Sequence, residues 1–306
     1  MTGTPDIFDR RLARLRRDRF AVHAARHEFL LERVADDLAE RLAAVRRSFP
    51  VVLDLGAHHG PLGRRIGRLP GVATVIDAEV SAGLLAQCSG LRVQCDEEVL
   101  PFRDQSLDLV VSGLSLQLVN DLPGVLTQVR RALKPDGLLL AAMLGGTTLF
   151  ELRTALLTAE EELEGGASPR VAPFADVRDM GALLQRAQFA LPVVDAETVV
   201  VTYANPLALM HELRGMGAAN ALSARSRKPL RRATLLRSFE IYAERFGLAN
   251  GRIPATFEIL TLTGWAPHES QPKPLQPGSA KMRLADALGT TEKPAGDPAR
   301  PPKATR

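Results

Sequence analysis

The chain has 306 residues, of which 45% are hydrophobic and 24% are charged, so it is long enough to bury a sizeable core. No apolar run approaches the roughly 18 residues that cross a bilayer, and the first residues lack the apolar core of a secretory signal. A cytoplasmic protein is therefore expected. The two cysteines do not make a disulfide framework or a zinc site. A net charge of +4 indicates no class of partner by itself.

The N-terminal stretch, residues 7–45, has apolar residues close to helical spacing and predicts one or two helices. Its arginines favour an anionic partner, or else form a solvated face balanced by neighbouring aspartates. Aromatic residues for base stacking are absent, so no nucleic-acid partner is expected. His23 and His27 lie one helical turn apart without an evident third ligand, so no metal site is expected. The arginines in the first half are Arg10, Arg11, Arg14, Arg16, Arg17 and Arg19.

The stretch Val51 to Gly60 is an apolar run that closes in Asp-Leu-Gly and then enters a short glycine-flanked turn. This pattern predicts a strand, a tight loop and a helix. Gly56 lets the chain turn where a Cβ would clash, and Gly60 opens the helix, so loop amides can approach a ligand closely. Asp54 suits a ligand that carries an ammonium group better than it suits a pyrophosphate. The alternative is an ordinary first turn of an α/β fold with no ligand.

A second predicted strand, residues 72–79, ends in two acids. An acid at the tip of this strand can accept hydrogen bonds from both ribose hydroxyls of a bound nucleoside. Glu79 is the first candidate. Asp77 is the reserve, because it lies two residues away and so on the same side of the strand. The alternative is that both acids merely begin the next helix.

Further strands at about 91–95, 106–112 and 138–143 alternate with helices such as 122–133, which calls for a parallel sheet with right-handed crossovers. Later segments predict helices at 176–187, 206–216 and 228–246 and strands at 192–203 and 255–265. The expected organisation is an N-terminal helical arm over 1–48 and a main domain over 49–265. Helical insertions fall at about 145–190 and 205–250, and a proline-rich tail over 266–306 is expected to be disordered.

Taken together, the motifs come in the order and spacing of class I S-adenosylmethionine (SAM) methyltransferases, which this chain resembles. They are the acid-glycine loop, the acid after the second strand, Asp-x-x-x-Leu-Pro-Phe from Asp96, Leu-Asp-Leu-Val-Val and Leu-Lys-Pro-Asp-Gly. The resemblance implies a Rossmann-like α/β fold with a seven-stranded, mostly parallel sheet, and SAM as cofactor. It also implies an adenine contact from Asp96 or Glu97. The implied cofactor-binding residues are Asp54, Gly56, Gly60, Glu79, Asp96, Glu97 and Ser112.

A narrower resemblance, over about residues 7–287, is to the complex I assembly factor 5 family. It is carried by Ile-Phe-Asp-Arg from Ile7, Ser112 to Pro123, Gly145 to Arg153, Glu-Gly-Gly from Glu164, Gly215 to Asn220, Gly264-Trp265 and His268 to Gln271. It implies hydroxylation of an arginine on the iron-sulfur subunit of complex I, with membrane contact only through that complex. The family is related to the malonyl-carrier-protein methyltransferase of biotin synthesis. His58 departs from a family loop glycine, and Gln117-Leu118 stands where relatives have His-Trp.

The reaction type stays open. Methyl transfer needs only an acceptor held in line with the methyl group and shielded from water, whereas hydroxylation usually needs iron or a flavin, for which the sequence shows no ligand pattern. Alternatives are a carboxyl O-methyltransferase of the malonyl-carrier-protein type and a non-catalytic assembly chaperone. Segments 145–153, 168–174 and 211–220 are expected to form a lid. Within it Glu151, flanked by Thr147 and Arg153, is the candidate for binding a partner arginine, which favours a bidentate carboxylate.

Overall fold

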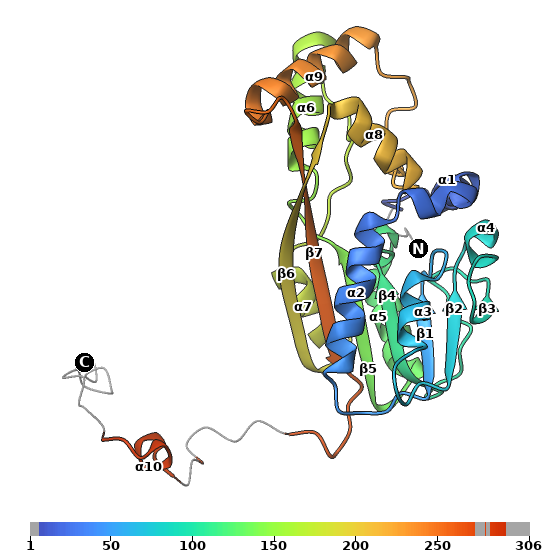
Figure 1. The fold of residues 1–306 in the computed structure, drawn as a ribbon, viewed down its shortest axis with the longest axis vertical. Coiled ribbons are helices and arrows are strands. Elements are labelled where there is room, and N and C mark those ends of the chain that lie inside the picture. The colour runs from blue at the N-terminus through green and yellow to red at the C-terminus, as the bar shows by residue number, and fades with distance from the viewer. Residues whose placement is uncertain (1–5, 273–278, 280–281, 292–306) are drawn as a thin grey trace, which may run out of the picture. The chain divides into compact units, whose positions relative to one another are not determined.

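The computed structural model describes residues 6–272, 279 and 282–291 (Figure 1). The chain divides into two units, Met1–His268 and Glu269–Arg306, and the sheet lies wholly in the first. The described part of the second unit contains one short helix, α10 (Leu284–Leu288). The expected disorder of the tail concerns residues 273–278, 280–281 and 292–306 in particular, which lie outside the described residues. Among the helices that the structure describes, none is long and apolar enough to cross a membrane.

The centre of the first unit is a seven-stranded sheet in the order β3-β2-β1-β4-β5-β7-β6. The pairs β1–β2, β2–β3, β1–β4 and β4–β5 are parallel, whereas β7 runs antiparallel to both β5 and β6. The predicted α/β fold with a mostly parallel sheet is confirmed. The strands are β1 (Val51–Leu55), β2 (Thr74–Ala78), β3 (Leu91–Val93), β4 (Leu107–Gly113), β5 (Leu133–Leu144), β6 (Ala190–Tyr203) and β7 (Ile253–Trp265).

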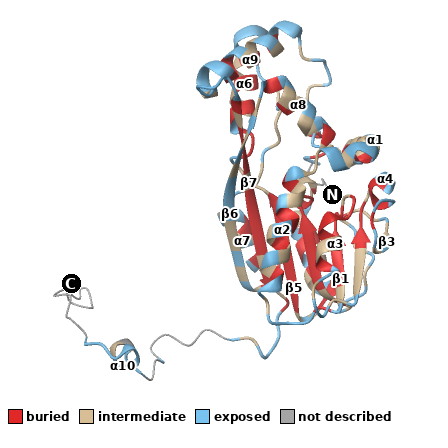
Figure 2. Cartoon of the chain, viewed as in Figure 1, coloured by how far each residue is buried: buried red, intermediate tan, exposed pale blue. Residues whose placement is uncertain are grey.

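Helices cover both faces of the sheet, because its central strands are apolar on both sides. On β1, Val52 belongs to the core of one face and Leu53 to the core of the other. The first face is covered by α2 (Phe29–Ala43) and α3 (Pro61–Ile66), and the second by α5 (Leu122–Ala132) and α7 (Val177–Arg186). Figure 2 shows the resulting layers, with buried strands between helices that are exposed on their outer sides.

The N-terminal stretch forms α1 (Arg10–Phe20), a 3-10 turn η1 (Ala21–Arg26) and α2. Helix α2 buries a stripe of Leu30, Val34, Leu38 and Leu42 in the core, which is the amphipathic pattern of a surface helix. Helix α1 begins at Asp9, whose carboxylate accepts a hydrogen bond from the Leu12 amide. Among its described residues only Ala13 and Arg17 are buried, so polar contacts place this helix rather than an apolar stripe.

Strands β6 and β7 continue beyond the rest of the sheet toward α6 (Phe150–Glu164) and α9 (Arg232–Phe246), which pack against each other (Figure 1). Helix α8 (Pro206–Gly215) follows β6. The predicted insertion segments therefore hold α6 and α7 in the first case and α8 and α9 in the second. The remaining short helices are α4 (Ala82–Leu85) and η2 (Leu116–Leu118).

Candidate functional site

The loop after β1 is compact and tied to the neighbouring strand. The amides of Gly56 and Ala57 both donate to the Ala78 carbonyl, at 2.8 and 3.0 Å. Gly56 has a φ of +71°, and a Cβ there would lie 2.0 Å from the Ser115 hydroxyl, so only glycine fits. Gly60 also has a positive φ and precedes Pro61 at the start of α3. The two predicted glycines thus shape the loop at the carboxyl end of β1.

Asp54 lies beneath α3 rather than at the centre of the site. One of its carboxylate oxygens accepts the Gly63 amide at 2.9 Å, and the other has no hydrogen-bond partner within the described chain. Burial, followed by the charge of Asp77, raises the pKa of Asp54 well above its usual value. A Cβ on Gly63 would touch both carboxylates. Asp77, the reserve candidate for the ribose, therefore belongs with Asp54 under the helix.

Glu79 and Glu97, which follow β2 and β3, converge on one arginine of α1. Arg17 donates to the carboxylate of Glu79 at 3.1 Å and to that of Glu97 at 3.1 Å, and it reaches the Ser115 hydroxyl at 3.4 Å. Glu79 also accepts the backbone amides of His58 and Ser81. All of these side chains except His58 are buried, with Glu79 at 0% and Arg17 at 6% exposure. The sequence-predicted ribose acid is thus at the centre of a buried polar cluster.

A second arginine of α1, Arg10, contacts Asp96 and Glu97, the two residues that the resemblance assigns to adenine binding. Arg10 donates to Asp96 at 2.6 Å and also contacts Glu97, whose other oxygen accepts the Ser115 hydroxyl at 2.7 Å. Arg10 and Arg17 are seven residues apart, or two helical turns, so they project from the same face of α1. One helix therefore supplies guanidinium groups to acids at the ends of two adjacent strands.

These charges stabilise one another against the cost of burial. Burial alone would lower the pKa of Arg17, but the carboxylates of Glu79 and Glu97 outweigh it, so that pKa lies above the ordinary value. Burial would likewise raise the pKa of Glu97, yet Arg17 and Arg10 bring it down to about 2. Burial is the dominant influence on Glu79 and raises its pKa despite Arg17. Because desolvation of single charges is expensive, the cluster is stable only while its members remain paired.

His58, which stands where the family pattern has a glycine, changes the contacts that the loop after β1 makes. His58 has a φ of +52°, the left-handed region that a glycine adopts freely, and its ring nitrogen Nε2 lies 3.1 Å from the Gly113 carbonyl. His58 is half-buried, and the loss of water around its ring, followed by the nearby Arg17 charge, lowers the pKa of His58 to about 3. The imidazole therefore stays neutral and spans from the loop to the end of β4.

A pH effect should follow from His58. Its folded-state pKa of about 3 is below its usual 6.5, so the unfolded chain binds an extra proton as the pH falls through this window. The free energy of unfolding is expected to fall there by up to about 1.4 kcal/mol per pH unit. His58→Asn cannot titrate and tolerates the positive φ, so its loss of stability should be shallower. Urea unfolding at several pH values measures both slopes, and equal slopes would contradict the assignment.

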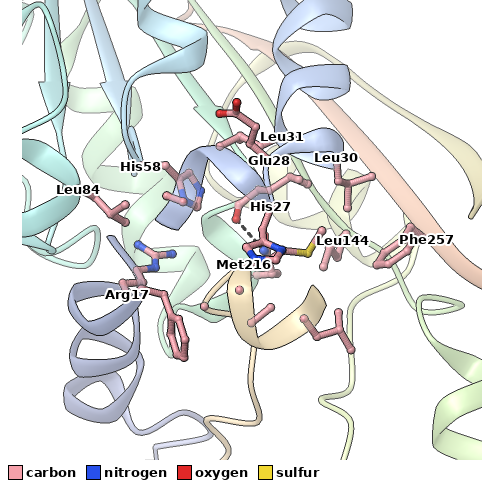
Figure 3. A pocket seen from close by; sticks show the side chains of 18 of the residues that line it. Arg17, His27, Glu28, Leu30, Leu31, His58, Leu84, Leu144, Met216 and Phe257 are labelled. Carbon is pink, nitrogen blue, oxygen red and sulfur yellow. Dashed lines mark hydrogen bonds between the residues drawn. The ribbon is translucent and has the colours of Figure 1, made fainter. Parts of the chain in front are cut away.

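Beside the polar cluster lies a cavity of about 130 Å³ whose walls are mainly apolar (Figure 3). Arg17 and His58 bound it on the side of the buried polar cluster, while Glu28 and His59 add polar atoms from the start of α2 and the loop. Each of the three expected lid segments contributes to the wall. The contributors are Leu149 from the first, Phe174 from the second, and Leu213 and Gly215 to Ala218 from the third.

Two predicted site residues lie elsewhere. Ser112 is 0% exposed and donates its hydroxyl to the Leu55 carbonyl at 2.7 Å, so it joins β4 to β1. Glu151 is 2% exposed on α6, and its carboxylate accepts the Thr256 amide at 3.2 Å and also contacts the Thr256 hydroxyl. A carboxylate so buried and so partnered is not available to an incoming arginine. Of the predicted set, Glu79, Asp96 and Glu97 come together.

Sequence reasoning missed Arg17, Ser115, Glu28 and His59. The arginines of α1 were recognised as a charged group, but their targets lie 60 residues or more away in the chain. The available signal was the heptad spacing of Arg10 and Arg17, which gives the helix a basic face opposite acids predicted at strand ends. The pairing of His59 with Glu28 had no local signal.

Comparisons with known proteins agree with this geometry. Residues 53–141 match the family described as "Methyltransferase domain". The chain is 40% identical over 289 residues to "Arginine-hydroxylase NDUFAF5, mitochondrial" of Danio rerio, covering 92% of this chain and 89% of the relative. It is 35% identical to the malonyl-[acyl-carrier protein] O-methyltransferase of Halorhodospira halophila, covering 86% and 90%. The solved YcgJ protein of Bacillus subtilis shares the fold, with a TM-score of 0.52, 16% identity and coverage of 76% and 98%.

The sheet order and the matched domain are those of class I SAM methyltransferases. The chain is an enzyme of that SAM-dependent superfamily, and the prediction of SAM as its cofactor is confirmed at that level. The likeness to the carrier-protein methyltransferase lies within the same superfamily. Over nearly its whole described length, however, the stronger similarity is to the hydroxylase, and the chain belongs to the family of the arginine hydroxylase NDUFAF5.

Proposed function

We propose that SAM binds this chain with its ribose at Glu79 and its adenine near Asp96 and Glu97. The observation that carries this proposal is the convergence of the two glutamates on the donors of a single side chain, Arg17. Ribose hydroxyls and an adenine amino group are donors of the same kind, so the acids fit the cofactor once the guanidinium withdraws. When bound, SAM would supply a methyl group or a positively charged sulfonium centre beside the acceptor.

We further propose that the acceptor is an arginine side chain of a protein, namely the iron-sulfur subunit of complex I. The cavity next to the cluster has the aliphatic walls that the methylene stem of an arginine requires, among them Leu31, Leu144 and Leu149. The three expected lid segments also contribute to its wall, which suits recognition of a protein loop. The name of the Danio rerio relative supports hydroxylation over methylation. Hydroxylation is a two-electron oxidation of the acceptor, whose oxygen atom would come from an oxidant other than SAM. The residues lining the cavity would hold the acceptor and exclude water.

The similarity to the Halorhodospira halophila enzyme favours a second candidate, O-methylation of a carrier-bound carboxyl group. A third candidate is an assembly chaperone without catalysis. The domain organisation proposed from the sequence, with an arm over 1–48, a main domain over 49–265 and a tail over 266–306, fits each of them. A cytoplasmic location stays a prediction, while the name of the Danio rerio relative assigns that protein to mitochondria.

The decisive measurement is the intact mass of the iron-sulfur subunit from wild-type cells and from cells that lack this protein. A mass increase of one oxygen atom in the wild type, lost on deletion, is expected. Re-expression of Glu79→Gln should not restore it, whereas the surface variant Asp104→Asn should, because the Asp104–Arg131 pair is exposed on both sides.

The other outcomes separate the alternatives. A gain of CH₂ would replace hydroxylation with methylation. An unmodified subunit, together with labelled methyl transfer to a malonyl carrier protein, would overturn the arginine acceptor. Rescue of complex I levels by Glu79→Gln, with no modification of the subunit, would support the chaperone.

A further inference from the structure

Three potential metal ligands, two of which line the cavity, meet beside it and outside the buried polar cluster. They are Glu28 and Glu32 of the α2 region and His59 of the loop after β1. One ligand atom from each, a carboxylate oxygen of each glutamate and a ring nitrogen of the histidine, all lie within 4.8 Å of one another. Glu28 and Glu32 are one helical turn apart and therefore project side by side. His59 is brought to them by the turn of the Asp-Leu-Gly loop.

The surroundings of these groups favour a cation. Arg65 contacts Glu32 and donates to Asp36 at 2.6 Å, so one guanidinium serves two carboxylates. Glu28 contacts the Nε2 atom of His59 instead. Arg64 donates to the backbone carbonyl of His59 at 2.7 Å, so three carboxylates lie near two guanidinium groups, and the remaining negative charge favours a cation.

The burial of the ligands fits a site rather than a solvated surface patch. The His59 side chain is 7% exposed, and those of Glu28 and Glu32 are 26% and 32% exposed. Glu28 and His59 both line the cavity of about 130 Å³, so coordination positions not taken by the protein would open into it. A closed structural site would instead need a fourth ligand from the chain.

We propose that Glu28, Glu32 and His59 bind a divalent first-row transition-metal ion at the wall of this cavity. One imidazole nitrogen and two carboxylate oxygens suit Zn²⁺, Mn²⁺ and Fe²⁺. On binding, the ion replaces the contact between Glu28 and His59, and Arg65 keeps its hold on Asp36. The sequence expectation of no metal site rested on His23 and His27, on the two cysteines and on the absence of an iron-ligand pattern. Here, in contrast, His59 follows the two glutamates by about 30 residues and is brought to them by the fold. The proposal concerns binding alone and does not depend on the reaction that the enzyme performs.

Metal binding is tested on the tag-free, full-length protein after chelation and removal of the chelator. Titration with Mn²⁺, followed by the electron paramagnetic resonance signal of the free ion, and calorimetry with Zn²⁺ should each give one equivalent per chain. His59→Ala and Glu28→Gln should each weaken binding about 10-fold or more, at least the effect of losing a supporting contact. Glu40→Gln is the matched control, because Glu40 is exposed on the same helix and is not part of the cluster.

Thermal unfolding in the presence of chelator shows whether each variant is folded. If His59→Ala does not fold, Glu32→Gln takes its place, because Glu32 is about a third exposed and outside the cavity lining. The proposal is overturned if the wild type binds neither ion, or if the ligand variants bind as tightly as Glu40→Gln. In that case the three residues form only a hydrogen-bonded network that holds α2 to the loop.

Discussion

Replacing Arg17 with methionine is expected to lower the free energy of unfolding by about 3 to 5 kcal/mol, the usual result of removing one partner from a buried ion pair. Methionine keeps much of the volume of the side chain, so the effect isolates the charge. Glu79 and Glu97 are 0% and 1% exposed and would be left without their shared guanidinium, although Arg10 still contacts Glu97. Urea denaturation of wild type and variant measures the difference.

The matched control for Arg17→Met is Arg14→Met, on the same helix. Arg14 is 49% exposed and pairs with Asp18 at 3.8 Å, a surface pair worth at most about 1 kcal/mol. If the two variants lose similar stability, the buried cluster does not hold α1 in place.

The pH dependence of the Arg17→Met variant gives a second readout. In the wild type, Glu97 has a pKa of about 2, so its contribution to stability is present above its usual pKa of 4.5 and is lost as the pH falls toward 2. Without Arg17, burial raises the pKa of Glu79 further, and the folded state takes up protons more readily than the unfolded one. Lowering the pH from about 7 to about 5 should therefore stabilise the variant relative to the wild type.

The same variant tests how SAM enters. If the ribose binds at Glu79 as proposed, SAM would displace Arg17 from that carboxylate in the wild type, whereas in Arg17→Met the ribose would supply hydrogen bonds to an otherwise unpaired carboxylate. The rise in melting temperature caused by SAM should then be larger for the variant than for the wild type. An equal or smaller rise would show that Arg17 stabilises the complex with SAM more than it competes with the ribose for Glu79.

Much of the fold was predictable because local patterns and the global arrangement agree. Strands β1 and β4 and the second half of β5 are mainly apolar and buried on both faces, and the helices between them carry clear apolar stripes. The role of Gly56 in the turn after β1 was predictable from the local sequence alone. The acid at the end of β2 followed from the rule that ligands bind at the carboxyl edge of a parallel sheet, whereas Asp96 and Glu97 after β3 followed from the resemblance to class I SAM methyltransferases.

The contacts between distant segments were not predictable in the same way. Arg17 meets Glu79 only because α1 lies across the strand ends, and no periodicity within α1 encodes that position. Glu151 illustrates the opposite case, in which the sequence suggests a site residue and the structure shows a buried side chain. An acid in a polar segment after a strand resembles a site residue. The burial of Glu151 follows from the part of β7 that extends beyond β5, where Thr256 pairs with Val200 of β6 and donates its amide to Glu151, and a single sequence does not reveal that register.

Replacing Glu79 with glutamine is expected to weaken SAM binding by about 1 to 3 kcal/mol, roughly 5- to 150-fold in Kd, because a charged acceptor of hydrogen bonds becomes a neutral one. Isothermal titration of the full-length protein with SAM measures the loss of affinity. The amides of His58 and Ser81 donate to different carboxylate oxygens of Glu79, so glutamine can accept only one of them and its amino group faces the other donor. Thermal unfolding of the variant without SAM therefore accompanies the titration, so that a change in the loop is measured separately from the loss of affinity.

Glu97→Gln and Asp104→Asn complete the experiment on the cofactor. Glu97 shares Arg17 with Glu79, so its variant should also weaken SAM, whereas the exposed Asp104 should leave the affinity at the wild-type value. If Glu79→Gln binds SAM as tightly as Asp104→Asn does, the ribose is not held at Glu79. Asp77 is then no substitute, because its carboxylate lies with Asp54 beneath α3, and the cofactor would have to bind through Asp96 and Glu97 alone.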